Sequence, residues 1–579
     1  MACIVRVNMK AQKVKVEEVP EDYLQLGGRS LTSRVVCDEV PPECHPLGPY
    51  NKIVISPGML AGTNAPSSGR ISVGGKSPLT GGIKESNAGT PVAQKLGRLQ
   101  VKAIIVEDKP EKEGSWLLKI NKDGAELEEA ADLKGKVTSE VNQELFSRHS
   151  KKAGVITIGP AGENRMAAAG ICFNDKEGRA TRYSGRGGLG AVLGSKGLKA
   201  IVVDETDAPG VEIKDKDLFK QGQIKLVDAL RNHDVTKPGG ALNSYGTAVL
   251  INILNEAGGL PTRNFSNGVF EGAEKISGEA IAETIKQRGG QGMTGHGCHP
   301  GCVIRCSNVY PKPDGSEHVS CLEYESDWAF GANCDIDNLD EIAELIRLCN
   351  EYGLDTIEMG VTVGVAMEAG LLEFGDGPGA IKLLQEVGQN TPLGHILGQG
   401  SEFTGRAYGQ TRIPTVKRQG MPAYEPRAVK GIGVTYITNP MGADHTSGYT
   451  ICPEILSVGG EADPLANEGK VDMSRTFQQV TGFIDSSGYC LFIAFAVLDF
   501  DSGNEGMVET VNAVLGTSYT PDDVPKLGDE VLKMEREFNR KAGITAVDDR
   551  PPEFMKYEKL PPHNKVFDIS DEELDQVWE

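Results

Sequence analysis

Three cysteines lie within nine residues of one another in the middle of the chain, in the segment Gly-Cys298-His-Pro-Gly-Cys302-Val-Ile-Arg-Cys306. A Pro-Gly turn separates the first two, so the three thiolates can converge on one centre. A 4Fe-4S cube needs four cysteine ligands, and a common arrangement takes three from one short loop and the fourth from a distant segment. The candidate for the fourth is Cys490, in Asp485-Ser-Ser-Gly-Tyr-Cys490-Leu-Phe. We therefore predict an iron–sulfur cluster.

Other sites could use the same cysteines. A structural zinc ion also takes cysteine and histidine ligands, and His299 could complete such a site, although we expect its side chain to point away from the thiol of Cys298. A set of buried thiols without metal is a second alternative, whereas the spacing of a radical-forming cluster motif does not fit. The other cysteines lack close neighbours, and we expect them to be buried in the core: Cys3, Cys37, Cys44, Cys172, Cys321, Cys334, Cys349 and Cys452.

The composition is that of a globular protein with several domains. A chain of 579 residues exceeds the size of one hydrophobic core, which predicts roughly two to four domains. The formal net charge of -21 disfavours nucleic-acid binding, which needs clustered Lys and Arg. No stretch approaches the length of a membrane span, and residues 1–10 read as a strand and not as a signal peptide. We expect a cytoplasmic protein whose cysteines bind metal or stay reduced.

The hydrophobic pattern changes along the chain. Runs rich in branched residues predict strands at 13–16, 52–56, 101–106, 155–158 and 198–203. After residue 205 the pattern becomes helical, with apolar residues at helical spacing up to Cys349, a C-cap glycine at Gly353, a helix over 361–369 and an amphipathic stretch around 531–538. The sequence thus predicts an α+β protein with a β-rich domain over 1–205 and two mainly helical domains over 206–415 and 416–579.

Glycine clusters favour a cofactor lined by main chain. The chain has 72 glycines, and Gly185, Gly187 and Gly190 form a G-x-G-x-x-G pattern. A dinucleotide site needs a hydrophobic strand directly before the first glycine, and polar residues precede it here, so a nicotinamide dehydrogenase is a weaker alternative. Arginines beside a donor-rich backbone still suit a phosphate-bearing ligand.

Ten segments together resemble the tungsten-pterin aldehyde ferredoxin oxidoreductase family. They span most of the chain in the family's order: Gly27–Leu31, Gly58–Gly62, Ser68–Arg70, Lys76–Gly81, Arg182–Lys196, the three-cysteine loop, Glu323–Glu325, Gly331–Cys334, Gly353–Thr356 and Asp485–Phe492.

The resemblance implies an oxygen-sensitive enzyme with a bis-pterin cofactor at the domain interface. Four dithiolene sulfurs would hold tungsten, or molybdenum, and a magnesium ion would link the pterin phosphates. The implied pterin-binding residues are Arg70, Asn87, Arg182, Tyr183 and Gly185 in the first domain, and Asn350, Leu354, Asp355, Asp485, Tyr489 and Leu491 in the other two. The implied cluster ligands are Cys298, Cys302, Cys306 and Cys490.

The sequence departs from the family pattern at two places. Three residues separate Cys298 from Cys302, where the family has two. Some members bind an iron ion between two subunits through an E-x-x-H motif, and this chain has Glu344-Leu-Ile-Arg347 there. The bridging iron is therefore not expected, although an oligomer still is.

The resemblance also implies a reaction. Oxidation of an aldehyde to a carboxylate needs a proton acceptor, for which Glu325 is the candidate and Glu323 the rival, and a group that polarises the carbonyl, for which His445 is the candidate. His296 and His299 are expected to belong to the cluster loop. Electrons would pass through the cluster to ferredoxin or a polyferredoxin-type subunit. The alternatives are a low-potential reduction such as aryl-CoA dearomatisation, or a noncatalytic electron-transfer subunit that holds only a cluster.

Overall fold

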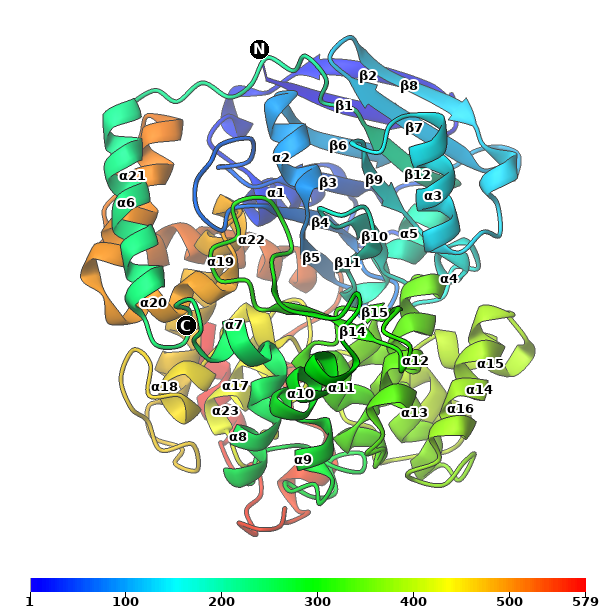
Figure 1. Ribbon diagram of the computed structural model, residues 1–579, viewed down its shortest axis with the longest axis vertical. Coiled ribbons are helices and arrows are strands. Elements are labelled where there is room, and N and C mark those ends of the chain that lie inside the picture. Colours follow the sequence, from blue (N-terminus) through cyan, green and yellow to red (C-terminus); the bar gives the residue numbers. More distant parts are fainter. Residues whose placement is uncertain (1, 579) are drawn as a thin grey trace.

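The computed structural model describes residues 2–578, so Met1 and Glu579 lie outside the description. The N-terminal part forms two six-stranded sheets, in the orders β2-β1-β6-β3-β4-β5 and β11-β10-β9-β12-β7-β8 (Figure 1). β1 pairs in parallel with β6 and β12 with β7, and the other neighbours are antiparallel. The strands are β1 (Cys3–Asn8), β2 (Lys13–Glu18), β3 (Ile53–Pro57), β4 (Arg70–Lys76), β5 (Ile83–Gly89), β6 (Val101–Glu107), β7 (Trp116–Asn121), β8 (Gly124–Glu129), β9 (Gly154–Thr157), β10 (Ile171–Asn174), β11 (Ala180–Ser184) and β12 (Leu198–Val203).

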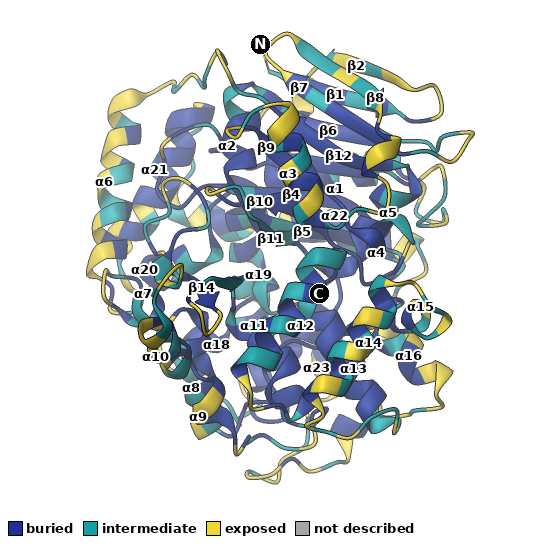
Figure 2. Ribbon diagram, turned by 45° about the vertical axis from the view of Figure 1, so that its right-hand side comes forward, coloured by how far each residue is buried: buried dark blue, intermediate teal, exposed yellow. Residues whose placement is uncertain are grey.

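One hydrophobic core joins the two sheets. It contains Ile55 and Ile104 from the first sheet and Ile156 and Ile201 from the second, all completely buried. Branched side chains of this kind pack well on a pleated surface, which is why the sequence runs predicted strands correctly at β1, β2, β3, β6, β9 and β12. Figure 2 shows β6 and β12 in the buried interior, whereas α6 carries an exposed outer face.

The rest of the chain is mainly helical, which confirms the predicted α+β class. The N-terminal part contains α1 (Gly28–Glu39), α2 (Pro91–Arg98), α3 (Thr138–Arg148), α4 (Pro160–Glu163) and α5 (Leu189–Ser195). The following helices are α6 (Lys216–Asn232), α7 (Ala241–Tyr245), α8 (Leu250–Glu256), α9 (Ala273–Ile276), α10 (Gly278–Arg288), α11 (Tyr324–Phe330), α12 (Leu339–Tyr352), α13 (Thr356–Glu368), α14 (Gly377–Gly388), α15 (Pro392–Gly398) and α16 (Ser401–Ala407). The last are α17 (Lys430–Thr438), α18 (Ile451–Ile455), α19 (Lys470–Ser487), α20 (Ala494–Asp499), α21 (Asp501–Leu515), α22 (Val524–Lys541) and α23 (Asp571–Asp575). The domain boundaries at 205 and 415 stay predictions.

A small sheet interrupts the helical region and was not predicted. β13 (Met293–His296), β14 (Ser307–Pro311) and β15 (Glu317–Ser320) form an antiparallel sheet on either side of the cluster loop. Strands of four or five residues with glycine and proline are too short to give a clear alternation. The sheet matters because β13 and β14 hold the two ends of the three-cysteine loop.

One edge strand of each large sheet faces the helical part. β5 ends the first sheet and β11 ends the second, and the two strands contact each other. β11 directly precedes the glycine-rich segment and was not among the predicted strands, because its polar sequence hides the pattern. It pairs only with β10, in antiparallel fashion, so the βαβ unit of a dinucleotide site is not formed here.

A buried ion pair ties the two ends of the chain together. The guanidinium of Arg29 in α1 donates to both carboxylate oxygens of Glu535 in α22, at 3.0 and 2.8 Å, and to Asp485 in α19 at 3.3 Å. Arg29 and Glu535 are fully buried, with 1% and 0% of their side chains exposed. A charge buried this deeply needs its partner, so the pair fixes α22 against α1.

Among residues 2–578, no single helix has the length and apolar character needed to cross a membrane. α19 meets the criterion only together with Leu491–Asp499, across a bend of 120°, and by length and composition alone.

We expect Glu535→Ala to lower the free energy of unfolding by about 3 kcal/mol, because the variant leaves Arg29 buried with only Asp485 opposite it. Chemical denaturation followed by circular dichroism measures the change. Glu537→Ala in the same helix is the control, because it removes only exposed pairs with Arg540 and Lys541 and should change stability little. Equal stability of both variants would show that the Arg29 pair does not hold this junction.

Candidate active site

A cavity of about 360 Å³ lies where the sheet edges meet the helices. Every predicted site residue lines it except Tyr489 and Leu491. The hydroxyl of Tyr489 bonds to that of Thr510 in α21, and Leu491 packs on the helical core. Between these two residues, Cys490 lines the cavity.

One serine joins the two loops that carry the predicted cluster ligands. The Ser67 carbonyl accepts the N–H of Cys490 at 2.8 Å, and its hydroxyl accepts the N–H of Val303 at 3.1 Å. The N–H of Ser67 donates to the carbonyl of Gly301 at 3.0 Å. Gly301 has φ of 85°, a conformation that favours glycine. The four predicted ligands thus line one cavity, although the loop of Cys490 lies far along the chain from the three-cysteine loop.

Arg70 and Gly89 shape the thiol end of the cavity. The Arg70 guanidinium donates to the Cys490 sulfur at 3.3 Å and to the Asn87 amide oxygen at 3.2 Å. A Cβ atom at Gly89 would lie 2.7 Å from the Cys298 sulfur, so only glycine fits there. Gly89 was missed in the sequence, where it stands among many other glycines.

His299 lies closer to the thiols than expected. A nitrogen of its ring and the sulfurs of Cys298 and Cys302 all lie within 4.8 Å of one another. Both ring nitrogens face main chain, however: Nδ1 is 2.8 Å from the Pro300 carbonyl and Nε2 is 3.4 Å from the Gly69 amide. The buried ring packs against Gly69, where a side chain would collide with it. This arrangement favours ligation by thiolates over a zinc site that includes the histidine.

The predicted pterin-binding segments meet on the opposite wall. The Tyr183 hydroxyl donates to the Asn350 carbonyl, which joins β11 to the end of α12. Asp355 caps α13 by accepting the N–H of Ile357 at 3.0 Å, and it also accepts from Arg186 Nε at 3.2 Å. Arg186 lines the cavity and was not singled out in the sequence, where it is one of several arginines in the glycine-rich segment.

Glu325 and His445 lie beside each other in the cavity. Glu325 Oε2 accepts the N–H of Ala423 at 3.0 Å, while Oε1 lies 3.4 Å from His445 Nδ1. Burial raises the pKa of Glu325 to about 8. Burial also lowers the pKa of His445 to about 4. At neutral pH the pair is therefore a protonated carboxyl beside a neutral imidazole.

Glu323 also lines the cavity but has different partners. Its Oε2 accepts from the Thr247 hydroxyl at 2.8 Å, and its Oε1 lies 3.9 Å from Arg182. Arg182 in turn bonds to Ser307 at the end of the cluster loop. Glu323 thus faces the thiol side, and Glu325 is the glutamate beside the histidine.

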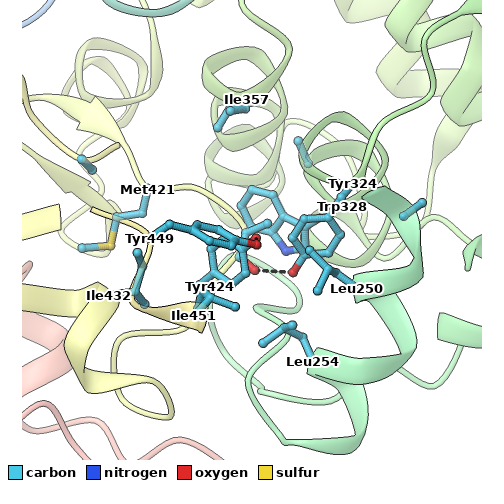
Figure 3. Close-up of a cluster of buried hydrophobic side chains, with 14 of the residues drawn as sticks. Leu250, Leu254, Tyr324, Trp328, Ile357, Met421, Tyr424, Ile432, Tyr449 and Ile451 are labelled. Carbon is cyan, nitrogen blue, oxygen red and sulfur yellow. Dashed lines mark hydrogen bonds between the residues drawn. The ribbon is translucent and has the colours of Figure 1, made fainter. Parts of the chain in front are cut away.

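Aromatic residues form the wall behind His445. Its ring centroid lies 6.1 Å from that of Tyr424 and 6.4 Å from that of Tyr449. The two tyrosine hydroxyls are 2.7 Å apart, and Tyr324 packs on Tyr424. Figure 3 shows the three tyrosines among Leu250, Ile357 and other apolar side chains. This wall was not predicted, because its members come from separate segments.

The remaining cysteines follow the prediction in part. Cys172, Cys334, Cys349 and Cys452 are buried, whereas Cys3, Cys37, Cys44 and Cys321 are half-buried. Cys321 lines the cavity instead of lying in the apolar core, because it follows β15 at the cavity's edge.

The polar groups of the cavity suit a polar ligand. Within residues 2–578, Arg70 Nε, Arg182 Nε, Glu85 Oε1, Glu325 Oε1 and His445 Nδ1 are buried without a hydrogen-bond partner. Buried polar atoms are normally paired, so five unpaired atoms on side chains that line one cavity indicate a bound group. The thiols fit a cluster, and the guanidinium groups fit an organic cofactor with phosphates.

Comparison with known proteins identifies the family of this chain. The family model described as aldehyde ferredoxin oxidoreductase, N-terminal domain, matches residues 4–205, and the model for domains 2 and 3 matches residues 223–579. The tungsten-containing aldehyde ferredoxin oxidoreductase of Pyrococcus furiosus is 38% identical over 96% of this chain and 91% of its own length. The protein of that name from Thermococcus kodakarensis is 39% identical over the same shares.

A solved structure shares the fold. The active site complex BamBC of benzoyl coenzyme A reductase, in complex with 1,5-dienoyl-CoA, aligns with a TM-score of 0.79 and 19% identity, over 100% of this chain and 93% of that one. The family models cover most of the chain, and the identity to the curated relatives extends over nearly all of it. The chain therefore belongs to the aldehyde ferredoxin oxidoreductase family of oxidoreductases.

Proposed function

We propose that this enzyme oxidises aldehydes to carboxylates in the cavity and passes the electrons through a 4Fe-4S cluster to ferredoxin or a polyferredoxin-type subunit. The observation that carries the proposal is the placement of the Glu325 and His445 pair in the same cavity as the four thiols. The relatives named as tungsten-containing aldehyde ferredoxin oxidoreductases support the choice of metal and substrate. The protein would be cytoplasmic and oligomeric.

The cavity residues divide into two cofactor sets. The four cysteines at 298, 302, 306 and 490 would bind the cluster, with Arg70 between it and the pterin. The pterin phosphates and their magnesium ion would lie near Arg182 and the glycine-rich segment. When bound, the tungsten bis-pterin, or its molybdenum form, supplies the sink for two electrons.

Glu325 and His445 would handle the protons. A neutral imidazole with one free nitrogen can donate a hydrogen bond to a carbonyl oxygen, and Glu325 can take a proton from water once it is ionised. A base is most effective when its pKa lies near the working pH, and burial gives Glu325 a pKa of about 8. Oε1 and Nδ1 lie 3.4 Å apart and neither has a hydrogen-bond partner, so both atoms are free to bind substrate or water.

Electrons would leave through the cluster loop. Pro300, Gly301 and Arg305 are exposed, while the cysteines beside them are only half-buried. A partner that docks on this loop would therefore come close to the cluster without entering the cavity.

The second candidate function is a low-potential reduction such as dearomatisation of an aryl thioester. The wall formed by Tyr324, Tyr424 and Tyr449 supports it, because aromatic side chains stack on aromatic substrates. Anaerobically purified protein, with its tungsten measured, separates the two functions. Turnover of aldehyde with an oxidised dye supports the first, and turnover of aryl-CoA with a reduced dye alone would overturn it.

We expect Glu325→Gln and His445→Ala to lower kcat by about 10²- to 10⁴-fold, the range for removal of a general acid or base, while tungsten and iron contents stay unchanged. Glu323→Gln is the matched control, because this residue lies in the same segment but bonds to Thr247. If Glu323→Gln loses the activity and Glu325→Gln keeps it, the two glutamates must exchange roles.

The pH dependence of kcat should follow Glu325. Its pKa is raised to about 8, so the active carboxylate forms as the pH rises, and kcat should increase from pH 7 to pH 9. His445 stays neutral over this range because its pKa is lowered to about 4. The increase should be absent in the residual activity of Glu325→Gln. A wild-type profile that falls over this range would contradict the assignment of Glu325 as the base.

Cys490→Ala should yield protein with depleted cluster iron, because one of four ligands is missing. Iron analysis and the visible absorption of the cluster measure the loss. Cys321→Ala is the control, since Cys321 also lines the cavity but belongs to no predicted ligand set. Full iron content in Cys490→Ala would show that another group is the fourth ligand.

A further inference from the structure

Strand β5 places a glutamate in the cavity for which the proposed reaction has no role. Alternate residues of a strand face the same side, so Glu85, Asn87 and Gly89 share one face, and all three line the cavity. Asn87 bonds to Arg70 and to Asp485, and Gly89 makes room for the Cys298 sulfur. Of these three residues, Glu85 alone remains without a function.

The surroundings of Glu85 leave its carboxyl group partly unsatisfied. The residue is 6% exposed, and Oε1 has no hydrogen-bond partner in the described part of the chain. The Arg29 guanidinium, whose charge acts on Glu85, is already used by Glu535 and Asp485. A buried polar atom without a partner is costly, so its presence beside a cavity points to a ligand atom.

The carboxyl group of Glu85 is held in its neutral form. Burial, together with the Asp485 carboxylate, raises the pKa of Glu85 well above the ordinary value. A protonated carboxyl offers one O–H donor and one carbonyl acceptor side by side. This pattern matches a ring edge that carries an N–H beside a C=O, as the pyrimidinone edge of a pterin does.

We propose that Glu85 is a further cofactor-binding residue that pairs with the amide-like edge of a pterin ring through two reciprocal hydrogen bonds. The inference rests on the proposed function, which supplies the pterin. A metal ion shared by Glu85 and Asp485 fits less well, because the Arg29 guanidinium lies 3.3 Å from the Asp485 carboxylate and would repel a cation.

A second buried carboxyl provides the control. Both oxygens of Asp327 in α11 are buried without a partner among residues 2–578, and the residue is completely buried, but it does not line the cavity. Asp327→Asn therefore makes the same kind of change away from the proposed ligand.

The test measures tungsten, pterin and iron per chain in anaerobically purified wild type, Glu85→Gln, Glu85→Met and Asp327→Asn. Glutamine keeps a donor and an acceptor, so Glu85→Gln should retain pterin like the wild type. Methionine keeps the volume but neither hydrogen bond, so Glu85→Met should lose pterin and tungsten about tenfold faster during dialysis, with its iron intact. Asp327→Asn should retain both.

Every other outcome contradicts either the proposed function or the role of Glu85. Wild type without pterin and tungsten would overturn the proposed function, and this inference with it. Loaded wild type with equally loaded Glu85→Met would overturn the inference alone. Depletion of Glu85→Gln to the level of Glu85→Met would overturn the reciprocal pairing. Loss of iron together with pterin in Glu85→Met would indicate a general defect of the fold and also count against the inference.

Discussion

The three hydrogen bonds of Ser67 are the constraint on which the rest of the site depends. Through its carbonyl, hydroxyl and amide, this one residue of the first sheet region holds the Cys490 loop and the three-cysteine loop together. The thiols come from segments nearly two hundred positions apart, so their own loops cannot bring them together. Arg70, which follows three residues later, then reaches from the thiols to the Asn87 amide. The β-rich part thus acts as the template on which the helical parts assemble the cavity.

Burial decides the protonation states of Glu325 and His445, at the other end of the cavity. Glu325 and His445 would form an ordinary ion pair in water at moderately acid pH, but the low polarity around them disfavours both charges. The carboxyl keeps its proton and the imidazole stays neutral, so neither group carries the charge that a salt bridge requires. The three tyrosines behind the histidine contribute to this environment. The same physical cause acts on Glu85, whose pKa burial also raises.

Much of this site could be predicted from sequence, and the failures have physical reasons. Cysteine spacing and the ordered family segments found Cys490, because thiol clusters are rare in a reduced protein. His299 was expected to point away, but its ring lies beside the thiols, between the Pro300 carbonyl and the Gly69 amide. Glu85 was not singled out, because a glutamate in a polar strand is normally expected to face solvent. β11 was missed for the same reason, because polar cavity-lining residues remove the hydrophobic alternation by which strands are recognised.

The bond between Arg29 and Glu535 has a consequence for how the enzyme matures. Arg29 and Glu535 lie about five hundred positions apart, so this ion pair can form only after the chain has been synthesised as far as Glu535. The two large sheets can fold earlier, because their strands all precede residue 204. During that interval the cavity lacks Asp485 of α19 and the Cys490 segment that follows it, and stays accessible. A bulky metal cofactor would then be inserted before the final helices dock. Its later release would require the Arg29–Glu535 ion pair to break.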